Sequence, residues 1–191
     1  ILDCTKKYCV YLPQGYADGD KDFPVLYLLH GLTDIHNAWR DKGKVCEIAT
    51  ELIKDGKAHE MIIVMPDAGT TYDGYFNSDG WRYEDFFFQE FLPAMEKKYQ
   101  AVGDKEHRAV MGLSMGGIAT FDIVARFPEK FAAAIPICGS VNPKRIVNTK
   151  GVAWRIFHGD ADAAVPVEGS REAYKALRDA GMDVEYIEFP G

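Results

Sequence analysis

The segment Gly112-Leu113-Ser114-Met115-Gly116 places one serine between two glycines, a spacing that can present a hydroxyl nucleophile. An apolar run at 108–111 precedes it, and a helix-compatible run at 118–126 follows it. Because the glycines allow a sharp turn between strand and helix, Ser114 is predicted at the tip of that turn with its hydroxyl facing a cleft. The pattern therefore predicts a nucleophile for acyl transfer. The alternative is a plain glycine-rich turn with an uninvolved serine.

A serine hydroxyl needs a base, an acid that orients the base, and hydrogen-bond donors for the oxyanion. The backbone N–H of Met115, directly after the nucleophile, is predicted to be one donor. The run Leu28-Leu29-His30-Gly31-Leu32 is an apolar strand that opens into a glycine-containing turn. The backbone N–H of Leu32 is therefore predicted to be the second donor.

The acid is expected in the segment 158–166, which follows an apolar run and contains two aspartates. Asp160 and Asp162 are both suitable on chemistry alone, and the alternative for either is a turn carboxylate or a helix cap. Both follow Ser114 in the chain, which is the order serine, acid, histidine found in α/β-hydrolases. The segment therefore predicts an orienting carboxylate at one of these two positions.

The base is not found where this order requires it. His36 lies in a loop after a strand and is a candidate substrate contact, whereas the other histidines are predicted to support turns or lie on the surface. We expect the base beyond residue 191, so that these residues are a piece of a longer enzyme; a degenerate hydrolase scaffold is the alternative. The five histidines, all of which precede Asp162, are His30, His36, His59, His107 and His158.

Apolar runs alternate with helical patterns along the whole chain. Strands are expected at 8–12, 25–29, 61–65, 109–113, 132–138, 152–157 and 184–189. Helices are expected at 45–53, 87–99, 118–126 and 173–180. Pro93 should kink the helix 87–99 or start its second half, and Gly181 should end the helix 173–180. The alternation predicts a single domain over 1–191 with a mostly parallel sheet and helices on both faces. Loops 30–40, 67–82, 112–116, 139–145 and 158–166 should then lie at the carboxyl ends of the strands.

Composition excludes several classes of protein. The formal net charge of −7 argues against nucleic-acid binding, and no apolar run is long enough to span a membrane. The cysteines show no zinc-type spacing. If residues 4–12 formed one strand, the side chains of Cys4 and Cys9 would point to opposite faces and could not form a disulfide. Cys138 is expected to be a buried small hydrophobic residue within a strand.

Together these motifs resemble the esterase-D-like serine esterases of the α/β-hydrolase fold, a group that includes feruloyl esterases, acetyl xylan esterases, tributyrin-type esterases and S-formylglutathione hydrolases. The resemblance implies a three-layer α/β-hydrolase fold with a mostly parallel central sheet. It favours Asp162 over Asp160 as the acid, and it implies a base histidine in a Gly-His pair directly after a segment like 189–191. The segments that carry it are 11–16, 23–32, 65–67, 112–117, 158–159, Asp162 and 165–166.

The substrate is expected to bind near aromatic side chains. The loop 69–82 holds four aromatic residues among small polar ones, and Trp81 and Trp39 are candidate walls for a feruloyl or sugar ring. The alternative is that Tyr75, Phe76 and Trp81 pack this loop onto the domain. The predicted function is hydrolysis of feruloyl or acetyl esters on plant cell-wall xylan. Neither a metal nor a cofactor is needed, and the ligand is a small ester or an esterified oligosaccharide.

Three alternatives to this function stay open. Within the fold, the chain could be an S-formylglutathione hydrolase or a short-chain acyl esterase. A non-catalytic carbohydrate-binding scaffold and an acyltransferase are the others. A polysaccharide substrate would imply a secreted or periplasmic protein, whereas the S-formylglutathione alternative implies a cytoplasmic one; the sequence leaves the oligomeric state open.

Overall fold

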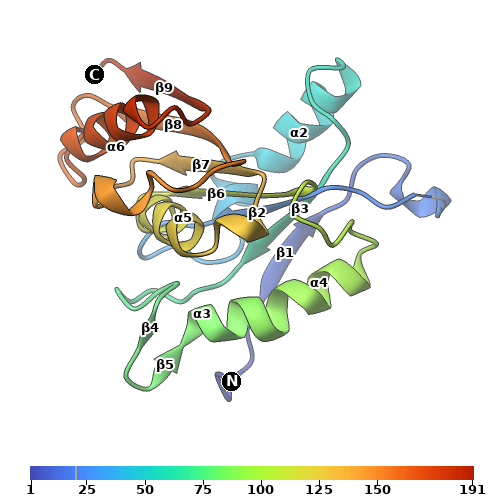
Figure 1. The fold of residues 1–191 in the computed structure, drawn as a ribbon. Helices are drawn as coiled ribbons and strands as arrows, with labels where there is room; N and C mark the ends of the chain where they lie inside the picture. Colours follow the sequence, from blue (N-terminus) through green and yellow to red (C-terminus); the bar gives the residue numbers. More distant parts are fainter. Residues whose placement is uncertain (20) are drawn as a thin grey trace. The chain divides into compact units, whose positions relative to one another are not determined.

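The computed structural model describes residues 1–19 and 21–191 (Figure 1). The contacts within the chain group it into two compact units, 1–103 and 104–191. No helix in the described part of the chain is both long and apolar enough to cross a membrane. The assignment of the whole chain to one domain stays a prediction.

The first unit contains three paired strands in the order β1-β3-β2. β3 (Ile62–Pro66) pairs antiparallel with β1 (Tyr8–Tyr11) and parallel with β2 (Val25–Leu29). β2 and β3 are almost entirely apolar and buried, as expected for strands covered on both faces. The other elements are η1 (Tyr16–Asp18), α1 (Ala38–Asp41), α2 (Val45–Lys54), β4 (Asn77–Ser78), β5 (Trp81–Arg82), α3 (Tyr83–Phe86), η2 (Phe87–Phe91) and α4 (Leu92–Lys98).

The segment 83–98 is helical throughout, with a π-helical turn at η2 between α3 and α4. Pro93 lies in the first turn of α4, directly after the π-helical turn η2. The prediction that Pro93 starts the second half of this helix is therefore confirmed. The aromatic stripe packs on the sheet: the ring of Phe87 lies 5.3 Å from that of Tyr27, and Phe91 lies 5.7 Å from Tyr8.

The second unit contains four parallel strands in the order β6-β7-β8-β9. Figure 1 shows α5 along β6 and β7, and α6 beside β8 and β9. Trp154 is fully buried on β8, stacks on Phe121 of α5 at 5.5 Å, and donates from Nε1 to Thr149 at 2.9 Å. The bounds are β6 (Arg108–Leu113), α5 (Met115–Arg126), η3 (Pro128–Lys130), β7 (Ala133–Ile137), η4 (Pro143–Arg145), β8 (Ala153–Gly159), α6 (Glu168–Asp179) and β9 (Val184–Phe189).

All seven predicted strands form, with ends shifted by at most two residues. The late helix ends at Asp179, and Gly181 follows in the left-handed region with φ +72, as predicted. Loops 30–40 and 67–82 leave the carboxyl ends of β2 and β3 in the first unit. In the second unit, loops 112–116, 139–145 and 158–166 leave those of β6, β7 and β8.

A strand that includes both Cys4 and Cys9 does not form, because β1 covers only Tyr8–Tyr11 and leaves Cys4 outside it; both cysteines are free. One expectation about the cysteines is wrong. Cys138 is neither within a strand nor buried, because β7 ends at Ile137 and the chain turns there. Cys138 takes a positive φ of 50°, donates its N–H to Phe157 at 2.9 Å, and is partly exposed.

Candidate active site

Ser114 occupies the single-residue turn between β6 and α5. Its backbone has φ 55° and ψ −114°, which is an unusual conformation for a residue with a Cβ. Two hydrogen bonds of 2.9 Å hold it: its N–H donates to Ile137, and its carbonyl accepts from Ile118. Met115 is the first residue of α5, so the helix itself offers no acceptor for the Met115 N–H. A turn of this kind can expose a serine hydroxyl beside a donor for an oxyanion.

The glycines around Ser114 are needed because backbone segments approach closely. A Cβ on Gly112 would lie 2.2 Å from the carbonyl oxygen of Gly116. A Cβ on Gly117 would lie 2.4 Å from the carbonyl oxygen of Ile137 at the end of β7. The pattern of small residues therefore builds the turn, as the sequence predicted.

The substitution Gly112→Ala should destabilise the protein by about 3 kcal/mol, because its Cβ must displace backbone rather than a flexible side chain. Urea unfolding followed by circular dichroism measures the change. Gly159→Ala is the matched control: it also lies at the end of a strand in the second unit, and the nearest atom to its added Cβ is 4.0 Å away. Equal stabilities of the two variants would contradict this account of the turn.

Asp162 lies in the loop after β8 and is held by its own backbone. Its Oδ1 accepts from the N–H groups of Ala164 at 2.8 Å and Val165 at 2.9 Å. The hydrogen bond from Val165 is the main reason that the pKa of Asp162 is below its usual value. Its Oδ2 faces His158, whose Nε2 is 3.6 Å away. Asp162 is therefore an ionised carboxylate with a fixed orientation, which is what an orienting acid requires.

Asp160, the other aspartate of this loop, has a different environment. Its side chain is exposed, and Oδ1 accepts from the N–H of Gly191 at 2.9 Å. The geometry thus favours Asp162, in agreement with the resemblance, and the role of either as an acid stays a prediction.

His158 is buried and links the loop of Asp162 to α6. Its Nε2 lies 2.9 Å from the carbonyl oxygen of Val165, and its Nδ1 lies 2.8 Å from Oγ of Ser170. Oγ of Ser170 also lies 3.1 Å from the carbonyl oxygen of Gly139, to which it can donate. Both ring nitrogens are engaged, so His158 supports a turn, as predicted.

The sequence analysis missed a cluster beside Asp162. Ligand-type atoms of Cys138, His158 and Asp162 all lie within 4.8 Å of one another. Burial raises the pKa of the Cys138 thiol, which hydrogen-bonds to the carboxylate of Asp162. The sequence shows the apolar runs before Cys138 and His158, but it does not show that these runs become neighbouring parallel strands whose carboxyl ends meet.

In the first unit, the predicted oxyanion turn follows β2. The N–H of Asp34 donates to the carbonyl of Gly31 at 3.2 Å, and Thr33 has φ 68°, so the residues 31–34 form a tight turn. Leu32 is the second residue of this turn and is half-buried. Its role as an oxyanion donor stays a prediction.

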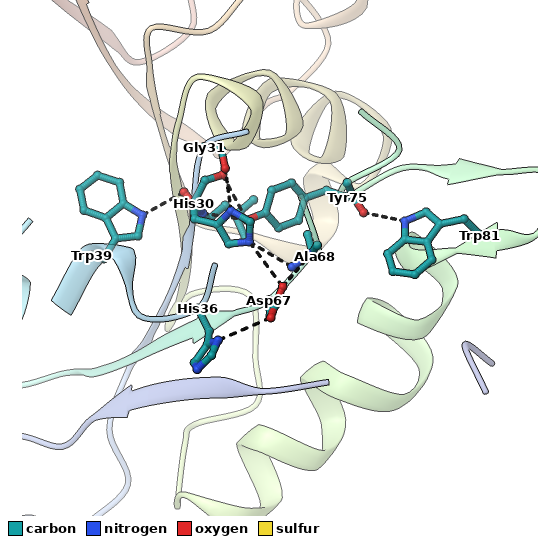
Figure 2. Close-up of polar contacts among 11 residues, drawn as sticks. His30, Gly31, His36, Trp39, Asp67, Ala68, Tyr75 and Trp81 are labelled. Atoms are coloured by element: carbon teal, nitrogen blue, oxygen red, sulfur yellow. Dashed lines mark hydrogen bonds and ion pairs between the residues drawn. The ribbon is translucent and has the colours of Figure 1, made fainter. Parts of the chain in front are cut away.

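His30, at the end of β2, anchors this turn (Figure 2). Its Nε2 accepts from the N–H of Ala68 at 3.1 Å, and its Nδ1 therefore donates to the carbonyl of Gly31 at 2.8 Å. Burial lowers the pKa of His30, which favours this neutral form. Tyr75 is buried, and its hydroxyl accepts from the N–H of His30 at 2.7 Å, so Tyr75 packs the loop 67–82 onto the unit.

The three predicted substrate contacts lie around this anchor (Figure 2). Nδ1 of His36 is 3.5 Å from the carboxylate of Asp67. Nε1 of Trp39 donates to the carbonyl of Leu29 at 3.0 Å, and Nε1 of Trp81 donates to the carbonyl of Gly74 at 2.8 Å. The two hydrogen bonds fix Trp39 and Trp81 to their own unit, whereas Nδ1 of His36 has no hydrogen-bond partner among the described residues. Contact with substrate stays a prediction for each.

Trp81 packs against two other side chains. Its ring stacks on Tyr83 at 5.9 Å, and the ammonium of Lys6 lies 4.4 Å from its centroid. These contacts support the alternative that Trp81 packs the loop.

Parallel strands with helical connections, and a serine on a strained strand-to-helix turn, define the class: the protein has the α/β-hydrolase fold. Residues 1–181 match the family model described as "Putative esterase", and the chain belongs to this esterase family. The predicted fold and the predicted resemblance to serine esterases are confirmed.

The relatives that the chain matches include proteins named as xylanases. The chain is 37% identical over 185 residues to an endo-1,4-beta-xylanase/feruloyl esterase of Xylanibacter ruminicola, covering 92% of this chain and 25% of that protein. It is 29% identical over 149 residues to endo-1,4-beta-xylanase Y of Acetivibrio thermocellus, covering 72% of this chain and 13% of that protein. The chain thus spans a quarter or less of the length of these curated relatives.

A solved structure of a ferulic acid esterase superimposes with a TM-score of 0.92 and 32% sequence identity. The match covers 100% of this chain and 86% of that one.

Proposed function

We propose that this chain is the catalytic domain of a serine esterase that releases feruloyl groups from plant cell-wall xylan, with acetyl groups as the second candidate. The observation that carries the proposal is the backbone of Ser114, a strained non-glycine residue at the turn from β6 to α5. The activities named for the similar xylanase/feruloyl esterase and ferulic acid esterase support the choice of ester. A xylan substrate lies outside the cell, so we propose that the protein is exported.

The chemistry follows from the predicted roles. Oγ of Ser114 attacks the ester carbonyl carbon while a base histidine removes its proton. The N–H groups of Met115 and Leu32 stabilise the oxyanion, each contributing about 3 kcal/mol. The protonated histidine then gives its proton to the leaving sugar oxygen. Water, deprotonated by the same histidine, attacks the acyl-enzyme, releases ferulic acid and restores the serine.

Asp162 orients the base and stabilises its protonated form. Because its pKa is lowered, the carboxylate is ionised across the neutral range and faces the base with a full negative charge. The chemistry needs a histidine as the base, and no histidine follows Asp162 in residues 163–191.

The substrate ring is proposed to bind against aromatic side chains. Trp39 and Trp81 offer flat apolar surfaces, and His36 offers a polar group near the oxyanion turn. Since the Nε1 atoms of both tryptophans are already bonded to backbone carbonyls, only their rings are offered to substrate.

The full-length protein tests the choice of ester in parallel assays with methyl ferulate, acetylated xylan and S-formylglutathione. We expect methyl ferulate to give the highest kcat/KM. A higher value with S-formylglutathione would replace the proposal with the cytoplasmic alternative. Failure to hydrolyse any of the three would favour a binding scaffold.

A further inference from the structure

Cys138, His158 and Asp162 form a cluster of three different metal-ligating side chains in the second unit. They come from the ends of the neighbouring strands β7 and β8 and the loop after β8. Their thiol, imidazole and carboxylate atoms lie within 4.8 Å of one another. These are the three ligand types that zinc takes in proteins, and the spacing of the cysteines along the chain does not reveal them.

The distances within the cluster fit two ligands of one ion better than a direct hydrogen bond. Nε2 of His158 and Oδ2 of Asp162 are 3.6 Å apart, which is too long for a hydrogen bond. Ligand atoms on a tetrahedral zinc lie about 3.5 Å apart. Cys138 completes a triangle, and small rotations of its thiol would bring it to the same distance. A water molecule would supply the fourth ligand.

The hydrogen bonds of His158 allow either of its ring nitrogens to carry the proton. When Nε2–H donates to Val165, the hydroxyl of Ser170 can donate to Nδ1, since the distances are 2.9 Å and 2.8 Å. When a metal takes the lone pair of Nε2, the carbonyl of Val165 must move away from Nε2, and the ring proton moves to Nδ1 and is donated to Oγ of Ser170. The hydroxyl of Ser170 then donates to Gly139, 3.1 Å away. Ser170 thus provides the partner that a metal-bound histidine needs.

Solvent can reach the cluster from one side. His158 is buried, whereas the side chain of Asp162 is 20% exposed and Cys138 is partly exposed. An ion can therefore enter past Asp162 and Cys138 and reach the buried imidazole last.

We propose that Cys138, His158 and Asp162 bind one zinc ion and that this ion inhibits the enzyme. Binding replaces the S–H bond of Cys138 with a sulfur–zinc bond, and the thiol proton passes to solvent. No electron is transferred. The inhibitory effect rests on the proposed function, because zinc engages the carboxylate that would otherwise orient the base histidine. The ion acts as a regulator and takes no part in ester hydrolysis.

Zinc binding is measured on the full-length protein by competition with a chromophoric chelator, which does not depend on activity. We expect one equivalent to bind to the wild type and the affinity to fall at least about 10-fold in C138S. The matched control C46S removes another partly exposed free cysteine, in the first unit, and should bind zinc like the wild type. S170A should lower the affinity about 10-fold, because it removes the acceptor for Nδ1–H.

Inhibition is measured as the ratio of methyl ferulate hydrolysis with and without zinc for each protein, so a change in basal rate does not affect it. We expect zinc to inhibit the wild type and C46S, and C138S to resist it. Circular dichroism melts check folding, and C138A tests the same loss if C138S is unfolded. Equal zinc affinity of wild type and C138S would overturn the site. Zinc binding by a protein without esterase activity would instead overturn the proposed function and leave the site intact.

Discussion

Ser114→Ala lowers kcat/KM for methyl ferulate at least about 10⁴-fold in the full-length protein, because no other group can form the acyl-enzyme. The loss should appear in kcat with little change in substrate binding, since the hydroxyl contributes its bond only during reaction. A fluorophosphonate probe should label the wild type and fail to label the variant. Steady-state kinetics and intact-protein mass spectrometry measure the two effects.

The matched control is Ser78→Ala, which removes an exposed serine on β4. The hydroxyl of Ser78 donates to Asp73 at 2.7 Å, so it makes an ordinary surface hydrogen bond. This variant should keep wild-type kinetics and labelling. Labelling that persists in Ser114→Ala, or kinetics unchanged by it, would remove Ser114 from the mechanism and leave only a glycine-rich turn.

Local sequence patterns were sufficient to predict the serine turn. The turn requires glycine at 112 and 117 because an added Cβ would lie 2.2 Å and 2.4 Å from backbone oxygens, and both glycines are close to Ser114 in the chain. The strands and helices around it follow from continuous apolar runs and helical periodicity in the same way. Features that depend on residues close together in the chain can therefore be predicted from the sequence.

Features that depend on which strands pair could not be predicted from the sequence. Cys138 was expected inside a strand because the apolar run continues through it, yet β7 ends one residue earlier and the chain turns at a positive φ. Its proximity to His158 and Asp162 exists only because β7 and β8 are neighbours. The enclosure of Trp81 by Tyr83 and Lys6 likewise joins residues that periodicity does not relate.

Asp162→Asn should lower kcat about 10⁴-fold while the protein stays folded. The amide oxygen of asparagine can still accept from the N–H groups of Ala164 and Val165, so the loop keeps its shape. The amide nitrogen then faces the base with two N–H groups where the carboxylate offered a lone pair. A donor at this position repels the N–H of the base and favours the tautomer that cannot take the proton from Ser114. Stopped assays with methyl ferulate, with circular dichroism as a check on folding, measure the loss.

Asp160→Asn is the matched control, two residues away in the same loop. Its exposed carboxylate accepts only from Gly191 among the bonds that the structure describes, so its neutralisation should leave kcat within about 2-fold of the wild type. Equal losses in the two variants would mean that loop charge, rather than the orientation of a base, matters.

The pH profile separates these cases further. Because the pKa of Asp162 lies below its ordinary value, this carboxylate is still ionised where the base histidine becomes protonated. The acid limb of wild-type activity should therefore report the histidine alone.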